Sequence, residues 1–212
     1  MKLTFGLFCA AACLFLSAPQ SQGSSLCATS ANLVANCGFE TGDFTSWTLA
    51  GNDVPGELNN LYGVEGTDPF PLPGGTAPNS GLFQAYFADQ NADPTTLSQV
   101  LSTGVGGQYT ITFYLAQELV GPGTVNNSVV VTFGGTTLTT MTDVAVQGYT
   151  RYSFTATATS PTTTLSLRFG NDVGEFLLDD VQVQSPEPAT WGLMLFAGLA
   201  LFLGRRRFGR AA

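Results

Sequence analysis

Large apolar residues alternate with polar ones along most of the middle of the chain. Between residues 109 and 116 every second side chain is large and apolar, which is typical of a strand with one buried face. The runs 129–133 and 136–141 repeat this pattern on either side of Gly134-Gly135, a pair that predicts a tight β-hairpin turn. Further strands are expected at 45–50, 81–88, 96–101, 152–158, 165–169 and 175–183. About nine strands with almost no helical period predict an all-β fold, a single two-sheet antiparallel β-sandwich.

Two stretches interrupt the alternation. Residues 51–80 hold five prolines and six glycines, which predicts a long irregular loop with little secondary structure of its own. A second loop is expected from Glu118 to Asn127. Long loops at the ends of a sandwich often carry binding sites, although a disordered excursion has the same composition.

Both ends of the chain are apolar without alternation. Residues 1–23 are typical of a secretory signal peptide, with Lys2 before an apolar run from 5 to 16 and small residues near position 23. Residues 189–204 carry no charge, and Arg205, Arg206 and Arg207 follow them. As a helix these 16 residues would span about 24 Å, less than the roughly 30 Å of a bilayer core. The segment is therefore a marginal transmembrane helix, with the arginines on the cytoplasmic side and the preceding domain outside.

This C-terminal order resembles the PEP-CTERM sorting signal of exported bacterial proteins. The resemblance rests on Pro186, Glu187 and Pro188, the apolar span, and the arginine cluster. It implies recognition by an exosortase, which would cut near the Pro-Glu-Pro motif and release the domain to the cell surface or an extracellular polysaccharide matrix. An ordinary tail anchor that keeps its helix is the alternative. The chain thus divides into a signal peptide (1–23), a β-sandwich domain (24–184) and a sorting signal (185–212), itself made of a Pro-Glu-Pro motif (185–188), a helix (189–204) and a basic tail (205–212).

Charge and cysteine usage agree with an exported domain. The whole chain has a net charge of −8, and residues 24–185 contain 14 acidic residues against two arginines, a net charge of −12. Such a surface repels nucleic acid and favours divalent cations. Cys9 and Cys13 belong to the signal peptide, so Cys27 and Cys37 remain as an even pair in an oxidising compartment. We predict a disulfide between them that ties the N-terminal arm to the first strand.

The two ends of the domain also resemble jelly-roll carbohydrate-binding modules. The resemblance rests on the opening segment 32–47, which contains Asn-Cys-Gly-Phe-Glu, and on the closing segment Phe176-Leu-Leu-Asp-Asp-Val-Gln-Val. It implies a structural calcium ion held by Glu40 and Asp179 together with backbone carbonyls. The alternation slips at Asp179-Asp180, which predicts a β-bulge that turns one aspartate inwards; the alternative is that both aspartates face water.

Candidate chemistry is limited to sugar binding. Stacking on a sugar ring needs exposed aromatic faces, and Trp47, Tyr62, Phe83, Tyr86 and Tyr114 are the candidates; Tyr86 and Tyr114 fit best, and Trp47 fits the core as well. The chain has no histidine, which excludes Ser/His and Cys/His catalytic sets and the usual zinc sites. A carboxylate pair drawn from Glu57, Glu65 and Glu118 would be needed for glycoside hydrolysis. The sequence therefore favours a non-enzymatic exported protein of the cell surface or exopolysaccharide matrix, with a dedicated carbohydrate-binding module as the alternative and a glycosidase third.

Overall fold

A computed structural model describes residues 27, 29, 31–51, 61–68, 76–90, 92–118 and 126–185. The predicted signal peptide (1–23) and the sorting signal beyond Ser185 lie outside these residues. Within them no helix is long and apolar enough to cross a membrane. The strands are β1 (Thr48–Ala50), β2 (Tyr62–Glu65), β3 (Gln84–Phe87), β4 (Thr95–Ser102), β5 (Gln108–Glu118), β6 (Asn127–Phe133), β7 (Thr136–Thr142), β8 (Gln147–Thr157), β9 (Thr162–Asn171) and β10 (Glu175–Gln184).

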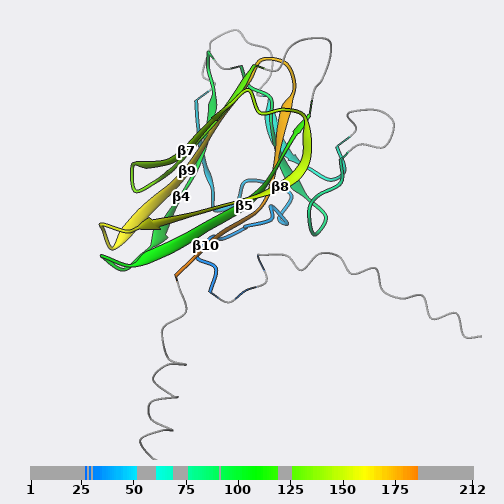
Figure 1. Cartoon of the computed structure of the whole chain (residues 1–212). Coiled ribbons are helices and arrows are strands. Elements are labelled where there is room, and N and C mark those ends of the chain that lie inside the picture. Colours follow the sequence, from blue (N-terminus) through cyan, green and yellow to red (C-terminus); the bar gives the residue numbers. More distant parts are fainter. Residues whose placement is uncertain are drawn as a thin grey trace, which may run out of the picture.

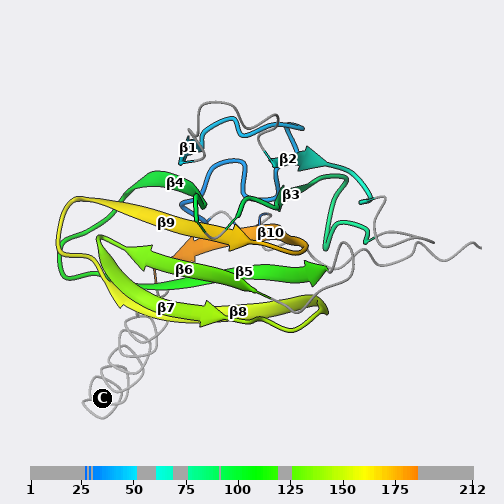
Figure 2. The same ribbon diagram turned by 90° about the horizontal axis from the view of Figure 1, so that it is seen from above.

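The strands form two antiparallel five-stranded sheets that pack face to face (Figure 1). The first sheet has the order β1-β4-β9-β6-β7, and the second has the order β2-β3-β10-β5-β8. The short strands β1, β2 and β3 gather at one side of the sandwich, as the view from above shows (Figure 2). The predicted all-β, two-sheet antiparallel sandwich is confirmed for the described residues.

The core lies between the sheets and uses the side chains that the alternation marked as inward. Ile111, Phe113 and Leu115 of β5 are fully buried, as are Leu165 and Leu167 of β9. Aromatic rings fill the end of the core near β3, where the centroids of Phe87 and Phe169 are 4.2 Å apart in a stacked arrangement. Because these positions recur every two residues on strands that face each other, the hydrophobic effect fixes which face of each sheet turns inwards.

The predicted hairpin is present between β6 and β7. Phe133 pairs with Thr136, so Gly134 and Gly135 form the two-residue turn. Their φ angles of 59° and 79° lie in the left-handed region, which glycine adopts without a steric penalty and which a type I′ turn requires at both positions.

The sequence-based interpretation of residues 51–80 as irregular missed one strand. β2 lies inside that stretch and pairs with β3 beyond it, in the register Tyr62↔Phe87 to Glu65↔Gln84. With four residues, one of them glycine, all only partly buried, β2 carries no alternation strong enough to predict it. The second predicted loop agrees with the strand bounds, because β5 ends at Glu118 and β6 begins at Asn127; residues 119–125 between them lie outside the described part.

Strand β10 is buried on both faces along almost its whole length. Its inner face belongs to the core, and segments from elsewhere in the chain cover the rest. The N-terminal segment runs along it, with backbone hydrogen bonds from Leu33 to Val183 (2.9 Å) and from Val181 to Cys37 (2.9 Å). Ser80, from the segment that leads into β3, donates its backbone N–H to Asp179. The polar side chains of β10 are consequently enclosed, and the candidate sites gather around them.

Candidate functional site

Tyr86 and Tyr114 both point to the outer face of the second sheet. Tyr86 of β3 pairs with Leu177 of β10, and Tyr114 of β5 pairs with Asp179 of β10, so these side chains share one face. Both tyrosines are only partly buried. Arg151 of β8, which is exposed, pairs with Tyr114 and so extends the same row. The outer face thus combines aromatic surface with a guanidinium group.

The ring of Tyr86 lies across a position without a side chain. A Cβ atom at Gly63, its partner on β2, would lie 2.6 Å from the Tyr86 ring and 2.7 Å from its hydroxyl oxygen. The ring therefore rests on bare β2 backbone. Burial raises the pKa of the Tyr86 hydroxyl, and the charges of Glu65, Glu175 and Asp89 add to the effect.

Trp47 belongs to the core. Its side chain is 8% exposed, its ring stacks on Phe39 with centroids 5.9 Å apart, and its Nε1–H donates to the backbone carbonyl of Asn36 (3.1 Å). Trp47 was a candidate both for sugar stacking and for the core, and its position fits the core. Little of the ring is left for a sugar to stack on.

The predicted bulge at Asp179-Asp180 is present. The register between β10 and β5 shifts between Asp179 and Gln182, and Asp180 has a φ of 52°. Both aspartates are buried, with 0% and 1% exposed, so the alternative that both face water is wrong. Asp180 accepts hydrogen bonds from the Ser80 hydroxyl (2.9 Å) and the Asn79 amide (2.8 Å). The segment before β3 thereby satisfies a carboxylate that the bulge turns inwards.

Glu40 and Asp179, the predicted calcium ligands, converge on the same segment. Glu40 accepts the backbone N–H of Leu82 (3.0 Å), and Asp179 accepts that of Ser80 (3.0 Å). Burial, with smaller contributions from the negative charges of Asp180 and Glu40, raises the pKa of Asp179 to about 8. Two carboxylates from the opening and closing segments are oxygen donors of the type that a hard divalent cation takes, and the binding of calcium by this pair stays a prediction.

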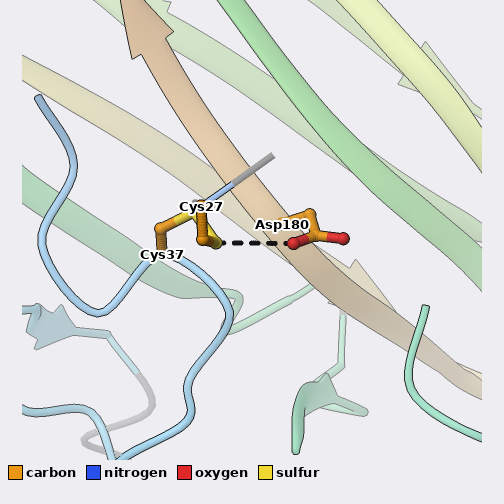
Figure 3. Close-up of side chains that lie close together, drawn as sticks. All are labelled: Cys27, Cys37 and Asp180. Atoms are coloured by element: carbon orange, nitrogen blue, oxygen red, sulfur yellow. Dashed lines mark hydrogen bonds between the residues drawn. A yellow bond between two sulfur atoms is a disulfide. The ribbon is translucent and has the colours of Figure 1, made fainter. Parts of the chain in front are cut away.

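The predicted Cys27–Cys37 disulfide is confirmed, but it does not reach the first strand, because Cys37 lies in a turn before β1. Cys27 and Cys37 are bonded, and the Sγ atom of Cys27 lies 3.4 Å from Oδ1 of Asp180 (Figure 3). The backbone carbonyl of Cys37 accepts the N–H of Val181 on the same strand. The disulfide therefore holds the opening segment against the bulge of β10.

A second group of carboxylates lies at the other end of β10. Glu175, the first residue of β10, pairs with Glu118, the last residue of β5. Carboxylate oxygens of Asp68, Glu118 and Glu175 lie within 4.8 Å of one another, and all three residues are buried. Glu65, at the end of β2, is close enough for its charge to act on Glu118 and Glu175. We call Glu65, Asp68, Glu118 and Glu175 the acidic cluster.

Burial and mutual repulsion dominate the electrostatics of the acidic cluster. Burial raises the pKa of Glu175 to about 8 and that of Glu118 to about 7, and the neighbouring carboxylates add to both shifts. Burial also raises the pKa of Glu65 to about 7, with the charge of Asp68 as the next cause. The two arginines of the described part, Arg151 and Arg168, are both exposed.

Sequence reasoning did not find the acidic cluster as a group. It named Glu65 and Glu118 as loop acids, but Glu175 was only the start of a predicted strand. The register Glu175↔Glu118 and the hydrogen bond from Asp68 N–H to the carbonyl of Thr76 (3.0 Å) bring the four together. The available signal was that Glu118 and Glu175 each stand at the end of a predicted strand. A single sequence does not show which strands pair when they are far apart in the chain, so it could not show that these two ends face each other.

The acidic cluster does not have the form of a glycosidase site. The side chains of Glu118 and Glu175 are only 5% and 8% exposed. Thr76 donates its hydroxyl to Glu118, and Gln84 donates its amide to the carbonyl of Thr76 (3.0 Å). A sugar ring has no room between carboxyl groups that are covered and this close together.

Comparisons with known proteins agree on the fold. No protein-family model matches the sequence, and no curated protein does. Among solved structures, the chain is similar to TmCBM61 in complex with beta-1,4-galactotriose, with a TM-score of 0.54 and 18% identity, over 73% of this chain and 99% of that one. It is also similar to the enzymatically active domain of tailspike protein 4 from bacteriophage CBA120 (TM-score 0.50, 13% identity, 74% of this chain and 22% of that one). The CBM22-1 xylan-binding domain of Xyn10C from Paenibacillus barcinonensis matches at a TM-score of 0.43 with 17% identity, over 72% of this chain and 93% of that one. At these identities the similarity to the first two structures shows the β-sandwich fold alone.

Proposed function

We propose that this protein is a non-catalytic module that binds an extracellular polysaccharide on the outer face of the sheet β2-β3-β10-β5-β8. The observation that carries the proposal is the placement of Tyr86 and Tyr114, two half-buried rings on one face of one sheet. Support comes from the fold, which matches TmCBM61, a module whose structure contains a galactotriose, along nearly its whole length.

The chemistry of this face suits a neutral or acidic sugar chain. Aromatic rings stack on the apolar C–H faces of sugars, and Gly63 has no side chain that would cover the neighbouring Tyr86 ring. Arg151, beside Tyr114, donates hydrogen bonds to hydroxyl or carboxylate groups. The net charge of −12 over residues 24–185 makes nucleic acid an unfavourable partner.

Affinity electrophoresis of the full chain in gels that contain galactan, xylan or an acidic exopolysaccharide tests the proposal. We expect at least one polysaccharide to retard the wild type, with Tyr114→Ala and Tyr86→Ala each weakening binding about tenfold because a stacked ring is lost. Tyr114→Phe is the matched control, since it keeps the ring and removes only the hydroxyl, and it should retain binding. Retardation that both alanine variants leave unchanged would contradict the assigned face.

We also propose that calcium bound by Glu40 and Asp179 braces the domain, and that the chain is exported and sorted. The convergence of the two carboxylates on the segment before β3 supports the calcium. The order of Pro-Glu-Pro motif, apolar span and arginines supports sorting by an exosortase. The disulfide fits a domain that folds in an oxidising compartment.

A further inference from the structure

We infer that the acidic cluster of Glu65, Asp68, Glu118 and Glu175 is a calcium-binding site, separate from Glu40 and Asp179. The bound ion would join the ends of β2, β5 and β10 to Asp68, whose backbone N–H donates to the carbonyl of Thr76. This inference does not depend on sugar binding.

The spacing of the oxygens fits one ion. A calcium ion binds its oxygen ligands at about 2.4 Å, so two oxygens on the same ion are at most about 4.8 Å apart. Asp68, Glu118 and Glu175 each offer one carboxylate oxygen, and these three oxygens lie within 4.8 Å of one another. A single ion can therefore reach all three without a change in the register of the strands that carry Glu118 and Glu175.

Unsatisfied oxygens provide a second and independent indication of a ligand. Oε2 of Glu118 and Oε1 of Glu175 are buried and accept no hydrogen bond, on side chains that are 95% and 92% buried. Oε1 of Glu65 is buried and unpartnered as well. A buried carboxylate oxygen without a donor is costly, and a bound cation offsets that cost.

The surroundings select the type of ion. Among the described residues, the side chains hydrogen-bonded around the acidic cluster offer oxygen or a neutral amide: Thr76 bonds Glu118, Gln84 bonds the carbonyl of Thr76, and Tyr149 bonds Gln84 (2.7 Å). Hard oxygen ligands suit calcium or magnesium rather than a transition metal. Three or four carboxylates that enclose the ion directly favour calcium, because magnesium holds its water more tightly and keeps several water ligands.

Calcium titration of the full chain by calorimetry, after removal of metal with EDTA and dialysis, tests the site. We expect a calcium-binding step, in addition to any at Glu40 and Asp179, that Glu118→Gln and Glu175→Gln each weaken by about tenfold or more, since each removes a charged ligand of similar size. Asp143→Asn removes an exposed acidic charge elsewhere and should leave this step unchanged. Asp179→Asn affects the other carboxylate pair and should also leave it unchanged.

Thermal unfolding gives a readout that needs no substitution in the acidic cluster. In the Asp179→Asn variant, calcium should still raise the melting temperature, and more than magnesium does at the same concentration. If a glutamine variant fails to fold, this measurement decides. Two outcomes would overturn the inference in favour of carboxyl groups held by shared protons: calcium leaves the melting temperature of Asp179→Asn unchanged, or both glutamine variants bind calcium like the wild type. A stronger stabilisation by magnesium than by calcium would also overturn it.

Discussion

Single residues of this protein are constrained by backbone that passes very close to them, and Gly174 is the clearest case. It precedes Glu175 with a φ of 139°, a conformation that other residues rarely adopt. A Cβ atom at this position would lie 2.1 Å from the backbone carbonyl oxygen of Glu118. Gly174 thus lets the turn before β10 pass against the end of β5, which places Glu118 and Glu175 of the acidic cluster opposite each other.

Replacing Gly174 with alanine should therefore destabilise the fold. We expect Gly174→Ala to lower the free energy of unfolding by about 2–4 kcal/mol, from the strained φ and the clash with backbone that cannot move aside. Gly148→Ala is the matched control, because a Cβ atom there meets nothing within 4 Å, and its effect should stay within about 0.5 kcal/mol. Urea unfolding followed by tryptophan fluorescence measures both, and equal midpoints for the two variants would refute the argument.

At the scale of elements, the disulfide acts as part of the sheet that contains β10. Cys27 and Cys37 are ten residues apart, and the N–H of Val181 on β10 donates to the carbonyl of Cys37. Removing the crosslink frees the N-terminal arm in the unfolded chain and weakens its attachment to β10 in the folded one. We expect the double variant Cys27→Ala/Cys37→Ala to lose about 2–3 kcal/mol of unfolding free energy.

Reductant provides the control for this prediction. Dithiothreitol should lower the urea midpoint of the wild type towards that of the double variant and leave the double variant itself unaffected. A double variant with the wild-type midpoint would show that the crosslink contributes nothing to the stability of the folded domain.

Most elements of the fold were predictable from sequence, because strands with one buried face alternate strictly. Residues 109–116 and 165–169 show this, and both became central strands. β2 was not predictable, because four half-buried residues with a glycine carry too little pattern. The bulge at Asp179-Asp180 was predictable, since the alternation visibly slips there. The acidic cluster was not, because it depends on which strands pair, and pairing is a property of the whole chain.

For the whole molecule, the proposed location outside the cytoplasm rests on the sequences of both chain ends and on the disulfide. If an exosortase processes the chain, the intact mass of the protein recovered from the medium or surface of its host should correspond to a C-terminus near Pro186–Pro188. An N-terminus near residue 24 should accompany it. Recovery of protein that retains residues 189–212 would instead identify an ordinary membrane-anchored protein.

The central place of β10 also has a consequence for the order in which the protein assembles. β10 lies between β3 and β5, yet it is the last strand to leave the ribosome and the translocation channel. Until it arrives, β3 and β5 each have an unpaired edge that invites association with other chains. Nearly all of its pairings are also distant in sequence, which favours slow folding.

The disulfide between Cys27 and Cys37 spans only ten residues, so it can form long before the last strand is available. If the chain is exported as proposed, its folding should depend on a chaperone that shields the unpaired edges of β3 and β5, and a chain truncated before Glu175 should aggregate rather than fold partway.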